Sequence, residues 1–304
     1  MRPRVWAAIV IASLGWGTAG IATRAALREG LGPYTIIGLR TLIAAVAVFL
    51  YRALRRRSWP GPRLWGLGAV LGITNITVPY IFFTLALQRA SAGFLGLVIA
   101  NIPLATAVWA HFFLADEPLN RQKALGLSLA VAGVAVLLAT GESGLGEGGR
   151  PGLALLLALA GVVVAAFGGV HARRHAPDHD VLDLAGPQFA LGAVVLVTTM
   201  LAVEGLPTGV SAAGWGLVAY MALAGTFTPF LLFFWMLQRV GATTASLPSY
   251  LIPVIALAGG ALLLDEQVTV VIGIGGVLIL AGVVFTERAE MEPPPAGPAP
   301  EMVP

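Results

Sequence analysis

The sequence predicts an all-α integral membrane protein with ten transmembrane helices, arranged as two five-helix repeats that are inverted relative to each other. Three observations predict this fold class. Hydrophobic residues make up 58% of the chain and charged residues 11%, against roughly 25% charged residues in an average soluble domain. Ten apolar stretches are long enough to cross a bilayer, and a motif-bearing segment recurs once along the chain. Lipid is therefore the expected solvent for most of the chain.

The ten predicted spans are recognised by length, because a membrane-crossing helix needs about 20 mostly apolar residues. They lie near residues 5–27, 34–53, 63–87, 90–114, 120–140, 151–172, 183–203, 212–237, 242–264 and 267–286. Most connections are short, which makes neighbouring helices antiparallel. The alternating pattern of a membrane β-barrel is missing, so the prediction is helical throughout.

Two segments of the chain are copies of one motif. Pro79 matches Pro229, Gln88-Arg89 matches Gln238-Arg239, and Pro103 matches Pro253, all at one fixed offset. After a one-residue gap, Asp116-Glu117 matches Asp265-Glu266. A repeat of this length predicts two structurally similar halves. We therefore expect a first repeat at 1–140, a glycine-rich periplasmic linker at 141–150, a second repeat at 151–286 and a disordered cytoplasmic tail at 287–304.

Arginine and lysine predict the orientation, because short loops rich in these residues favour the cytoplasmic side. With the N-terminus inside, 13 of the 18 fall on inside segments and only Arg28, Arg89 and Arg150 fall on outside segments. Ten spans also return the C-terminus to the cytoplasm. Five spans per half invert the second repeat in the membrane. Inverted repeats are typical of secondary transporters, whose substrate sites lie near the membrane midplane between the repeats.

Composition excludes several kinds of chemistry. The chain contains no cysteine, so disulfides, thiolate metal sites and cysteine nucleophiles are excluded. The formal charge of +3 is explained by loop arginines that set orientation, so nucleic acid is not an expected partner. No H-E-x-x-H motif and no adjacent histidine–carboxylate pair lies within a predicted span. We therefore expect no enzyme activity, no metal and no cofactor.

In their order and their duplication, the motifs resemble those of the EamA-type permeases of the drug/metabolite transporter superfamily. Each EamA half typically has a W-G motif in its first helix, an arginine in the second, a proline midway through the fourth and a glutamate at the end of the fourth. In the first half these are Gly15-Trp16-Gly17, Arg40, Pro103 and Glu117. The second half matches more loosely, with Phe167-Gly168, Gln188, Pro253 and Glu266. The resemblance covers about residues 5–286.

The resemblance implies a multi-pass carrier of small metabolites in the plasma (inner) membrane, working by alternating access and most often exporting amino acids or related compounds. An importer or exchanger of a nucleoside, sugar or vitamin-like solute on the same fold is the alternative. A non-transporting membrane scaffold is a more distant one. The implied partners are a small-molecule substrate and the lipid bilayer, and a homodimer stays open as an oligomeric state.

Four prolines are candidate hinge or gate residues, because a proline within a helix removes one hydrogen bond and leaves a carbonyl free. In a membrane that carbonyl must be satisfied by a neighbour or face a polar cavity. The four form two repeat-related pairs: Pro79 with Pro229, and Pro103 with Pro253. Because Pro248 stands five residues before Pro253 and has no partner in the first half, we expect the ninth span to be more bent than the fourth.

Four charged or titratable residues within the spans are further candidates, because charge in a membrane is costly. Arg24 and Arg40 could hold a substrate carboxylate, or could snorkel or hydrogen bond to a neighbouring helix end. His111 and His171 could carry protons or could be interfacial polar residues. The carboxylates all fall at helix ends, where we expect caps or gate contacts, so no buried carboxylate relay is predicted.

The resemblance implies that the first, third, fourth, sixth, eighth and ninth spans line the cavity, while the fifth and tenth are scaffold. Polar and aromatic residues deep in the lining spans are then substrate-binding candidates. They are Trp16, Thr18, Asn75, Thr77, Tyr80, Asn101, Thr226, Thr228, Trp235, Ser249 and Tyr250. The alternative for each is an interhelical hydrogen bond, worth about 0.6 kcal/mol on average.

Overall fold

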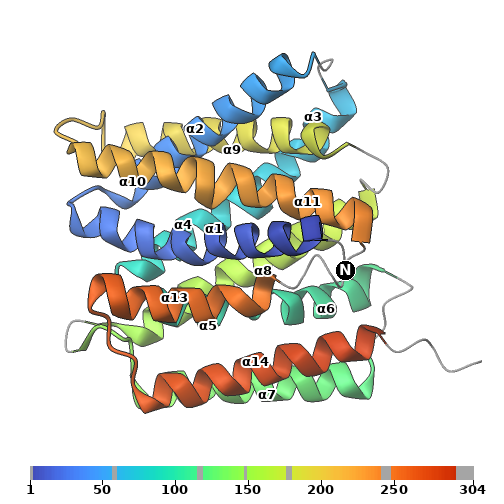
Figure 1. Ribbon diagram of the computed structural model, residues 1–304, viewed down its shortest axis with the longest axis vertical. Helices are drawn as coiled ribbons and strands as arrows, with labels where there is room; N and C mark the ends of the chain where they lie inside the picture. Colours follow the sequence, from blue (N-terminus) through green and yellow to red (C-terminus); the bar gives the residue numbers. More distant parts are fainter. Residues whose placement is uncertain are drawn as a thin grey trace, which may run out of the picture.

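The structure is a computed structural model that describes residues 3–56, 60–114, 119–146, 149–175, 180–240 and 248–291. Asp116, Glu117 and the tail beyond Met291 therefore lie outside the described residues. The described part is a bundle of helices that run side by side, back and forth across the molecule (Figure 1). It is an all-α membrane protein, as the composition predicted.

The helices of the first half follow the five predicted spans closely. They are α1 (Pro3–Arg28), α2 (Pro33–Leu54), α3 (Pro62–Leu71) with a π-helical segment η1 (Gly72–Thr77) and α4 (Val78–Leu87), α5 (Ala92–Ile99) with α6 (Ile102–Phe113), and α7 (Arg121–Thr140). Pro33 and Pro62 stand in the first turns of α2 and α3. A proline there costs no hydrogen bond, because the first N–H groups of a helix lack an internal acceptor.

The second half repeats this order of helices. It comprises α8 (Pro151–His175), α9 (Val181–Val203), α10 (Ala212–Ala222) with a π-helical segment η3 (Leu223–Phe227) and α11 (Thr228–Val240), α13 (Pro248–Leu264), and α14 (Val270–Met291). Eight helices of the described chain are long and apolar enough to cross a membrane, and Tyr250–Leu264 and Val270–Thr286 are shorter apolar helices. Together they account for the ten predicted apolar segments.

The packing of the helices has an approximate two-fold symmetry. The second span of each half packs on that of the other, α2 on α9, and the fifth spans likewise, α7 on α14. Contact of α1 with α13 is mirrored by contact of α8 with α6. Contact of α1 with α10 and α11 is mirrored by contact of α8 with α3 and α4. The two sequence copies therefore fold as two similar halves joined face to face.

The pair α7–α14 lies at one edge of the bundle (Figure 1) and is packed through glycine. A Cβ atom on Gly126 would lie 2.5 Å from the carbonyl oxygen of Gly282, and one on Gly133 would lie 2.7 Å from that of Gly275. Small residues let membrane helices approach closely. The glycines of the fifth and tenth spans thus set a tight contact between the two halves at this edge of the bundle.

Two expectations about helix ends differ from the structure. The fourth span is interrupted, because α5 ends at Ile99 and α6 begins at Ile102, whereas the described part of the ninth span, α13, is one helix with Pro253 inside it. Pro248 is the first residue of α13, where its missing N–H breaks no bond. The last helix also continues to Met291, into the segment predicted as a disordered tail.

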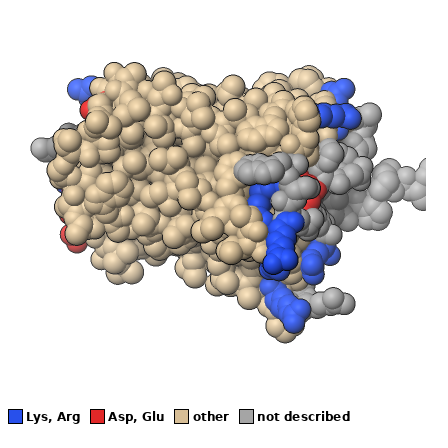
Figure 2. Space-filling model, turned by 90° about the horizontal axis from the view of Figure 1, so that it is seen from above, with Lys and Arg blue, Asp and Glu red and all other residues tan. Residues whose placement is uncertain are grey.

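Charge is distributed unevenly over the surface. Arginine and lysine gather at the end of the bundle where the N-terminus and the end of α14 lie, and the flank between the two ends is nearly free of charge (Figure 2). We refer to this as the terminal end, and to the other as the linker end, because residues 141–146 lie there. The prediction that the terminal end is cytoplasmic follows from the arginine bias.

Candidate functional site

The third and eighth spans are distorted at equivalent positions. The π-helical segment η1 ends just before α4 and η3 just before α11, and each is followed by a proline, Pro79 or Pro229. A proline cannot donate to the carbonyl four residues earlier, and π-bulges are common where helices adapt to such breaks or to function. The prolines therefore explain two widened turns that face the inter-half interface.

Arg40 satisfies the carbonyl that Pro229 leaves free. That carbonyl belongs to Gly225, four residues earlier, and Arg40 Nη2 donates to its oxygen at 3.0 Å. Arg40 Nε donates to Thr226 Oγ1 at 2.6 Å, and the residue is only 7% exposed. Arg40 thus holds η3 of the second half onto α2 of the first half, through hydrogen bonds to a mid-span segment rather than to a helix end.

Tyr80 completes a polar cluster around this arginine. The guanidinium carbon of Arg40 lies 4.4 Å from the centre of the Tyr80 ring, a cation–π contact. The Tyr80 hydroxyl also lies 3.5 Å from Thr226 Oγ1. Three sequence-predicted candidates, Arg40, Tyr80 and Thr226, are therefore brought together from α2, α4 and η3. In the described residues no carboxylate lies within ion-pair distance of Arg40.

The symmetric position holds a weaker contact of the same kind. We call the contacts of Arg40 with η3 and of Gln188 with η1 the two clamps. Gln188 of α9, which matches the arginine position of the second half, is fully buried, and its Oε1 accepts from Asn75 Nδ2 of η1 at 3.4 Å. Gln188 Nε2 and Thr77 Oγ1 are buried without a hydrogen-bond partner in the described chain. Each π-segment is thus contacted by a polar residue from the second span of the opposite half, and one clamp carries a charge while the other does not.

Aromatic residues form the apolar wall next to these clamps. Trp16 of α1 makes edge contacts with Phe230 and Phe233 of α11, both at 5.7 Å between ring centres. Phe230 also contacts Phe189 of α9 at 5.4 Å. Thr18 lies two residues after Trp16 on α1, and its hydroxyl is 2.6 Å from the Tyr220 hydroxyl of α10. Both first-span candidates therefore face the eighth span.

Asn101 bridges the interruption of the fourth span. Its Nδ2 donates to the carbonyls of Leu97 and Val98, at 3.2 and 3.1 Å, and the residue is buried. The Asn101 N–H donates to the Val98 carbonyl at 3.0 Å rather than to that of Leu97, four residues earlier, so the asparagine amide supplies a donor for the Leu97 carbonyl at the break. The Asn101 side-chain amide therefore donates within its own span, whereas the alternative interpretation expected an interhelical hydrogen bond.

The remaining candidates make none of the hydrogen bonds of the two clamps. Trp235 is stacked by Arg239 at 4.9 Å near the terminal end of α11, and Tyr250 packs beside Leu104 and Val283. Thr228 is half-buried at the start of α11. Pro253 lies within α13, close to α5. The side chain of Ser249 lies outside the described residues.

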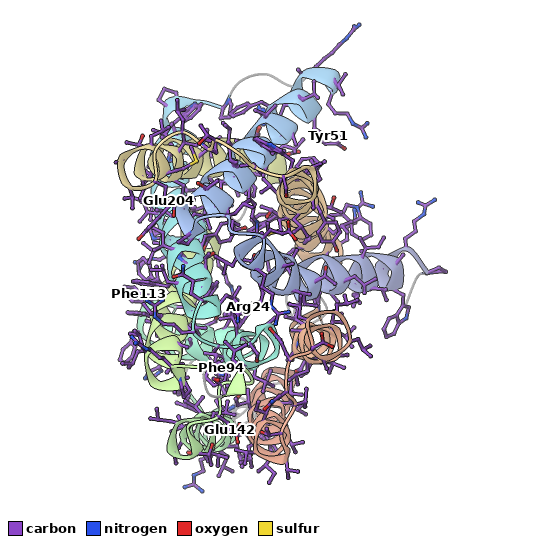
Figure 3. The ribbon with its side chains drawn as sticks, turned by 90° about the vertical axis from the view of Figure 1, so that its left-hand side faces the viewer. Arg24, Tyr51, Phe94, Phe113, Glu142 and Glu204 are labelled. Atoms are coloured by element: carbon purple, nitrogen blue, oxygen red, sulfur yellow. The ribbon has the colours of Figure 1, made fainter. Side chains whose placement is uncertain are left out.

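Arg24 belongs to a group of contacts that close the linker end by joining the two halves there, far along α1 from the clamps. Figure 3 labels Arg24 near the middle of the bundle as seen from the left-hand side of Figure 1. Arg24 Nη1 donates to the Leu87 carbonyl at 2.5 Å, and Arg24 Nε lies 4.0 Å from Glu266 Oε1. The Glu266 carboxylate accepts from the backbone N–H groups of Ala92, at 2.9 and 3.0 Å, and Gly93, at 3.4 Å. It thereby caps α5 from the other half, where a negative charge is favoured.

Glu266 is the buried carboxylate that sequence reasoning did not expect, since its side chain is only 2% exposed. Gly260 allows this, because a Cβ atom there would collide with the carboxylate. Burial raises the pKa of Glu266 above its ordinary value, while the hydrogen bonds from Ala92 and Gly93 and the charges of Arg24 and Arg28 act in the opposite direction. A polar cavity of about 230 Å³ adjoins the group.

The glycine-rich linker takes part in the same closure. Ser91 N donates to the Ser143 carbonyl at 2.8 Å, and Gln267 N donates to the Gly144 carbonyl at 3.0 Å. Gly144 has a φ of 74°, a conformation that favours glycine. The linker thus ties the α4–α5 turn of one half to the α13–α14 turn of the other, where composition alone suggested only a loose connection.

The two histidine candidates lie at the terminal end. His111 is exposed near the end of α6, and its Nδ1 accepts from the Leu119 N–H at 3.2 Å. His171 stands near the end of α8 beside His175, with ring centres 4.2 Å apart. Neither lies near the clamps around η1 and η3. Among the described residues, no group of three or more histidine and carboxylate side chains could hold a metal ion.

Comparison with known proteins assigns the chain to a family. The profile of the EamA-like transporter family matches residues 5–139 and 152–288, one match for each half. The chain belongs to the EamA-like transporter family. It is therefore a multi-pass membrane transporter of small solutes rather than an enzyme.

Relatives of this EamA-like transporter match over nearly their full length. The uncharacterized transporter YoaV of Bacillus subtilis is 25% identical over 283 residues, covering 92% of this chain and 95% of YoaV. The uncharacterized inner membrane transporter YedA of Escherichia coli K12 is 26% identical over 273 residues, covering 89% and 87%. A protein of known crystal structure shares the fold, with a TM-score of 0.67 at 21% identity over 96% of this chain.

Three residues of this EamA-like transporter escaped the sequence-based candidate list. Gln188 could have been found from its match to the arginine position, and Gly225 by counting four residues back from Pro229. Glu266 was recognised as a cap or gate contact, but its burial depends on the approach of α5 and on the absence of a side chain at Gly260. Only the packing of the two halves reveals that it is shielded from solvent.

Proposed function

We propose that this chain is a plasma-membrane secondary transporter that exports amino acids or related carboxylate-bearing metabolites by alternating access between its two halves. The observation that carries the proposal is the mirrored pair of π-segments at the inter-half interface, each held by a polar residue of the opposite half. Irregular backbone at membrane depth is tolerated only where protein or a polar cavity satisfies it. Discontinuous spans of this kind mark substrate sites in inverted-repeat carriers.

Charge supports a substrate that carries a carboxylate. Arg40 is a buried cation with no carboxylate partner among the described residues, and two of its donor nitrogens hold η3. An uncompensated buried cation is costly in a membrane. A substrate carboxylate next to the guanidinium would offset that cost. Tyr80, Asn75 and Thr77 lie on the same third span and are the adjoining candidates for the rest of the substrate.

Counterflow of radiolabelled solutes in proteoliposomes tests the proposal. The panel should contain neutral, acidic and basic amino acids beside a nucleoside, a sugar and a vitamin-like compound. We expect exchange with amino acids and reduced exchange in Arg40→Gln. Tyr80→Phe keeps the ring beneath the guanidinium and should retain more activity than Tyr80→Leu. Exchange restricted to solutes without a carboxylate would instead support the importer or exchanger alternative, and no exchange at all would support a scaffold.

A labelling experiment tests alternating access without knowledge of the substrate. The chain has no cysteine, so a single introduced cysteine is labelled uniquely. Ala86 and Met236 occupy repeat-equivalent positions, are both buried, and are predicted to lie toward opposite faces of the membrane. We expect impermeant maleimide to reach Ala86→Cys from outside and Met236→Cys from inside, with opposite responses to a transported solute. Labelling of both from one side would contradict the inverted orientation.

A further inference from the structure

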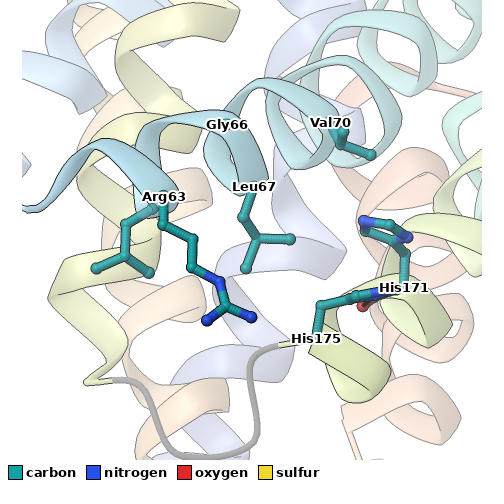
Figure 4. A pocket seen from close by; sticks show the side chains of 7 residues that line it. Arg63, Gly66, Leu67, Val70, His171 and His175 are labelled. Carbon is teal, nitrogen blue, oxygen red and sulfur yellow. Dashed lines mark hydrogen bonds between the residues drawn. The ribbon is translucent and has the colours of Figure 1, made fainter.

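A second cavity lies at the terminal end, between the third and sixth spans, and takes no part in the proposed transport path. Its volume is about 240 Å³. The lining comes from α3 and from the last turns of α8 (Figure 4). It consists of Arg63, Leu64, Gly66, Leu67, Val70, His171 and His175. This set divides into a basic group and an apolar group, which is the division found in an amphiphile.

The basic group comprises Arg63 in the first turn of α3 and the two histidines on α8. Arg63 and His175 are exposed, and His171 is partly buried. In the described residues no carboxylate lies within ion-pair distance of any of the three. His175 Nδ1 lies 3.0 Å from the His171 carbonyl, which holds the two rings side by side. Three nitrogen-bearing side chains with no anionic partner among the described residues form a setting that suits a phosphate group.

The apolar group lies deeper along the same helix. Leu67 and Val70 follow Arg63 by one and two turns of α3, so they extend from the charged rim toward the middle of the span. Gly66 contributes no side chain, and a Cβ atom placed there would meet no atom within 4 Å. The cavity is therefore a basic mouth above an apolar slot. A free phosphate would use only the mouth.

We propose that this cavity binds the phosphate headgroup of an anionic membrane lipid, with the glycerol and the upper acyl chain against Leu67 and Val70. Basic pockets between transmembrane helices on the cytoplasmic side are suited to anionic headgroups. The terminal end is the side that the arginine bias places in the cytoplasm. The bound lipid would join α3 to α8 and so fix one half of the transporter against the other at this end.

The test measures thermal unfolding of the full-length, delipidated protein in a nonionic detergent. The three probes are dioleoyl phosphatidylglycerol, dioleoyl phosphatidylcholine and inorganic phosphate. We expect phosphatidylglycerol to raise the unfolding temperature most. Native mass spectrometry should show one phosphatidylglycerol retained after the detergent is removed. The same increase with inorganic phosphate alone would overturn the membrane origin of the ligand.

Two variants locate the effect in this cavity. Arg63→Gln with His175→Gln removes the guanidinium and one imidazole, and we expect the apparent Kd for phosphatidylglycerol to weaken at least about tenfold, since a hydrogen bond from a charged group is lost. Gly66→Leu keeps every charge and places a side chain in the open space beside the cavity, so it should also lose the retained lipid while the protein stays folded.

The matched control is Arg121→Gln with His111→Gln. It makes the same change of residue types at the same end of the bundle but leaves the cavity lining intact. We expect this variant to bind phosphatidylglycerol like the wild type. Equal weakening in the control and the cavity variant would overturn the site and assign the effect to the overall basic charge of the terminal end. The outcome does not depend on which solute the transporter carries.

Discussion

The hydrogen bond from Arg40 to the Gly225 carbonyl predicts that a change at Pro229 alters the stability cost of removing the Arg40 side chain. Gly225 needs the arginine because Pro229 has no N–H to donate to its carbonyl. Replacing Pro229 by alanine supplies that N–H. The cost of Arg40→Ala should therefore be smaller in the Pro229→Ala background than in the wild type.

The magnitude follows from the contacts of Arg40. Arg40→Ala removes two hydrogen bonds from a charged donor, each worth about 1.5–3 kcal/mol, and a cation–π contact worth about 0.5–2 kcal/mol. It also removes a buried cation, which reduces the net loss. The unsatisfied carbonyl of Gly225 accounts for about 1–3 kcal/mol of the cost. That part alone is restored by Pro229→Ala, so the coupling energy should be about 2 kcal/mol.

The assay is reversible unfolding in mixed micelles with increasing sodium dodecyl sulfate, followed by the fluorescence of the seven tryptophans. The wild type, Arg40→Ala, Pro229→Ala and the double variant form a double-mutant cycle, and all four are measured. The control cycle pairs Arg40→Ala with Pro253→Ala, another mid-helix proline on a span that does not contact α2 within the packing described above. Changes at distant sites add to within about 0.5 kcal/mol. A coupling for Pro229 no larger than that for Pro253 would refute the reasoning.

Three further predictions concern the ends and the scaffold. Glu204 accepts from the N–H groups of Tyr34 and Thr35 at 3.0 and 2.6 Å, so Glu204→Ala should cost about 1–2 kcal/mol of unfolding free energy, whereas Glu29→Ala on the exposed surface should change it by less than about 0.5 kcal/mol. Gly282→Leu should cost at least about 1–3 kcal/mol by overpacking against Gly126 and Ala130, while Gly273→Leu on the same helix meets open space and should be nearly neutral in the same assay. The pKa of Glu266 is raised in the folded protein. The contribution of this group to the free energy of unfolding is therefore present in full below the pKa of an exposed glutamate, and it is lost as pH rises through the raised pKa. The unfolding temperature of the wild type relative to Glu266→Gln should therefore fall with rising pH, with Asp265→Asn behaving like the wild type, and a pH-independent difference would contradict this.

Much of the fold could be predicted because membrane spans are local in sequence. Length and apolar composition located ten segments, and the offset between Pro79 and Pro229 located the two halves. The free carbonyl beneath each proline was also predictable, since it follows from covalent structure. The bend expected at Pro248 does not appear in the described part of the ninth span, where Pro248 is the first residue of α13 and its missing N–H breaks no bond within that helix.

The partners of the polar residues could not be predicted from the sequence. Arg40 reaches Thr226 across 186 positions of the chain, and Glu266 reaches Ala92 across 174. Such pairs depend on which spans of the two halves pack together, and the repeat alone does not specify this. Gln188 shows the same limit, because its match to the arginine position says nothing about its contact with Asn75.

The position of each inter-half contact decides whether it can break during transport. Glu266 and the linker hydrogen bonds lie at the linker end beside a polar cavity, so water can replace every bond that opening would remove. The Arg40 clamp is deeply buried, and breaking it would leave a cation and a carbonyl without partners, at several kcal/mol. The two clamps should therefore persist as the pivot between the halves, while the contacts of Glu266 with α5 form and break. Cross-linking α2 to η3 beside Arg40 should then preserve exchange, whereas cross-linking the α13–α14 turn to the start of α5 should abolish it.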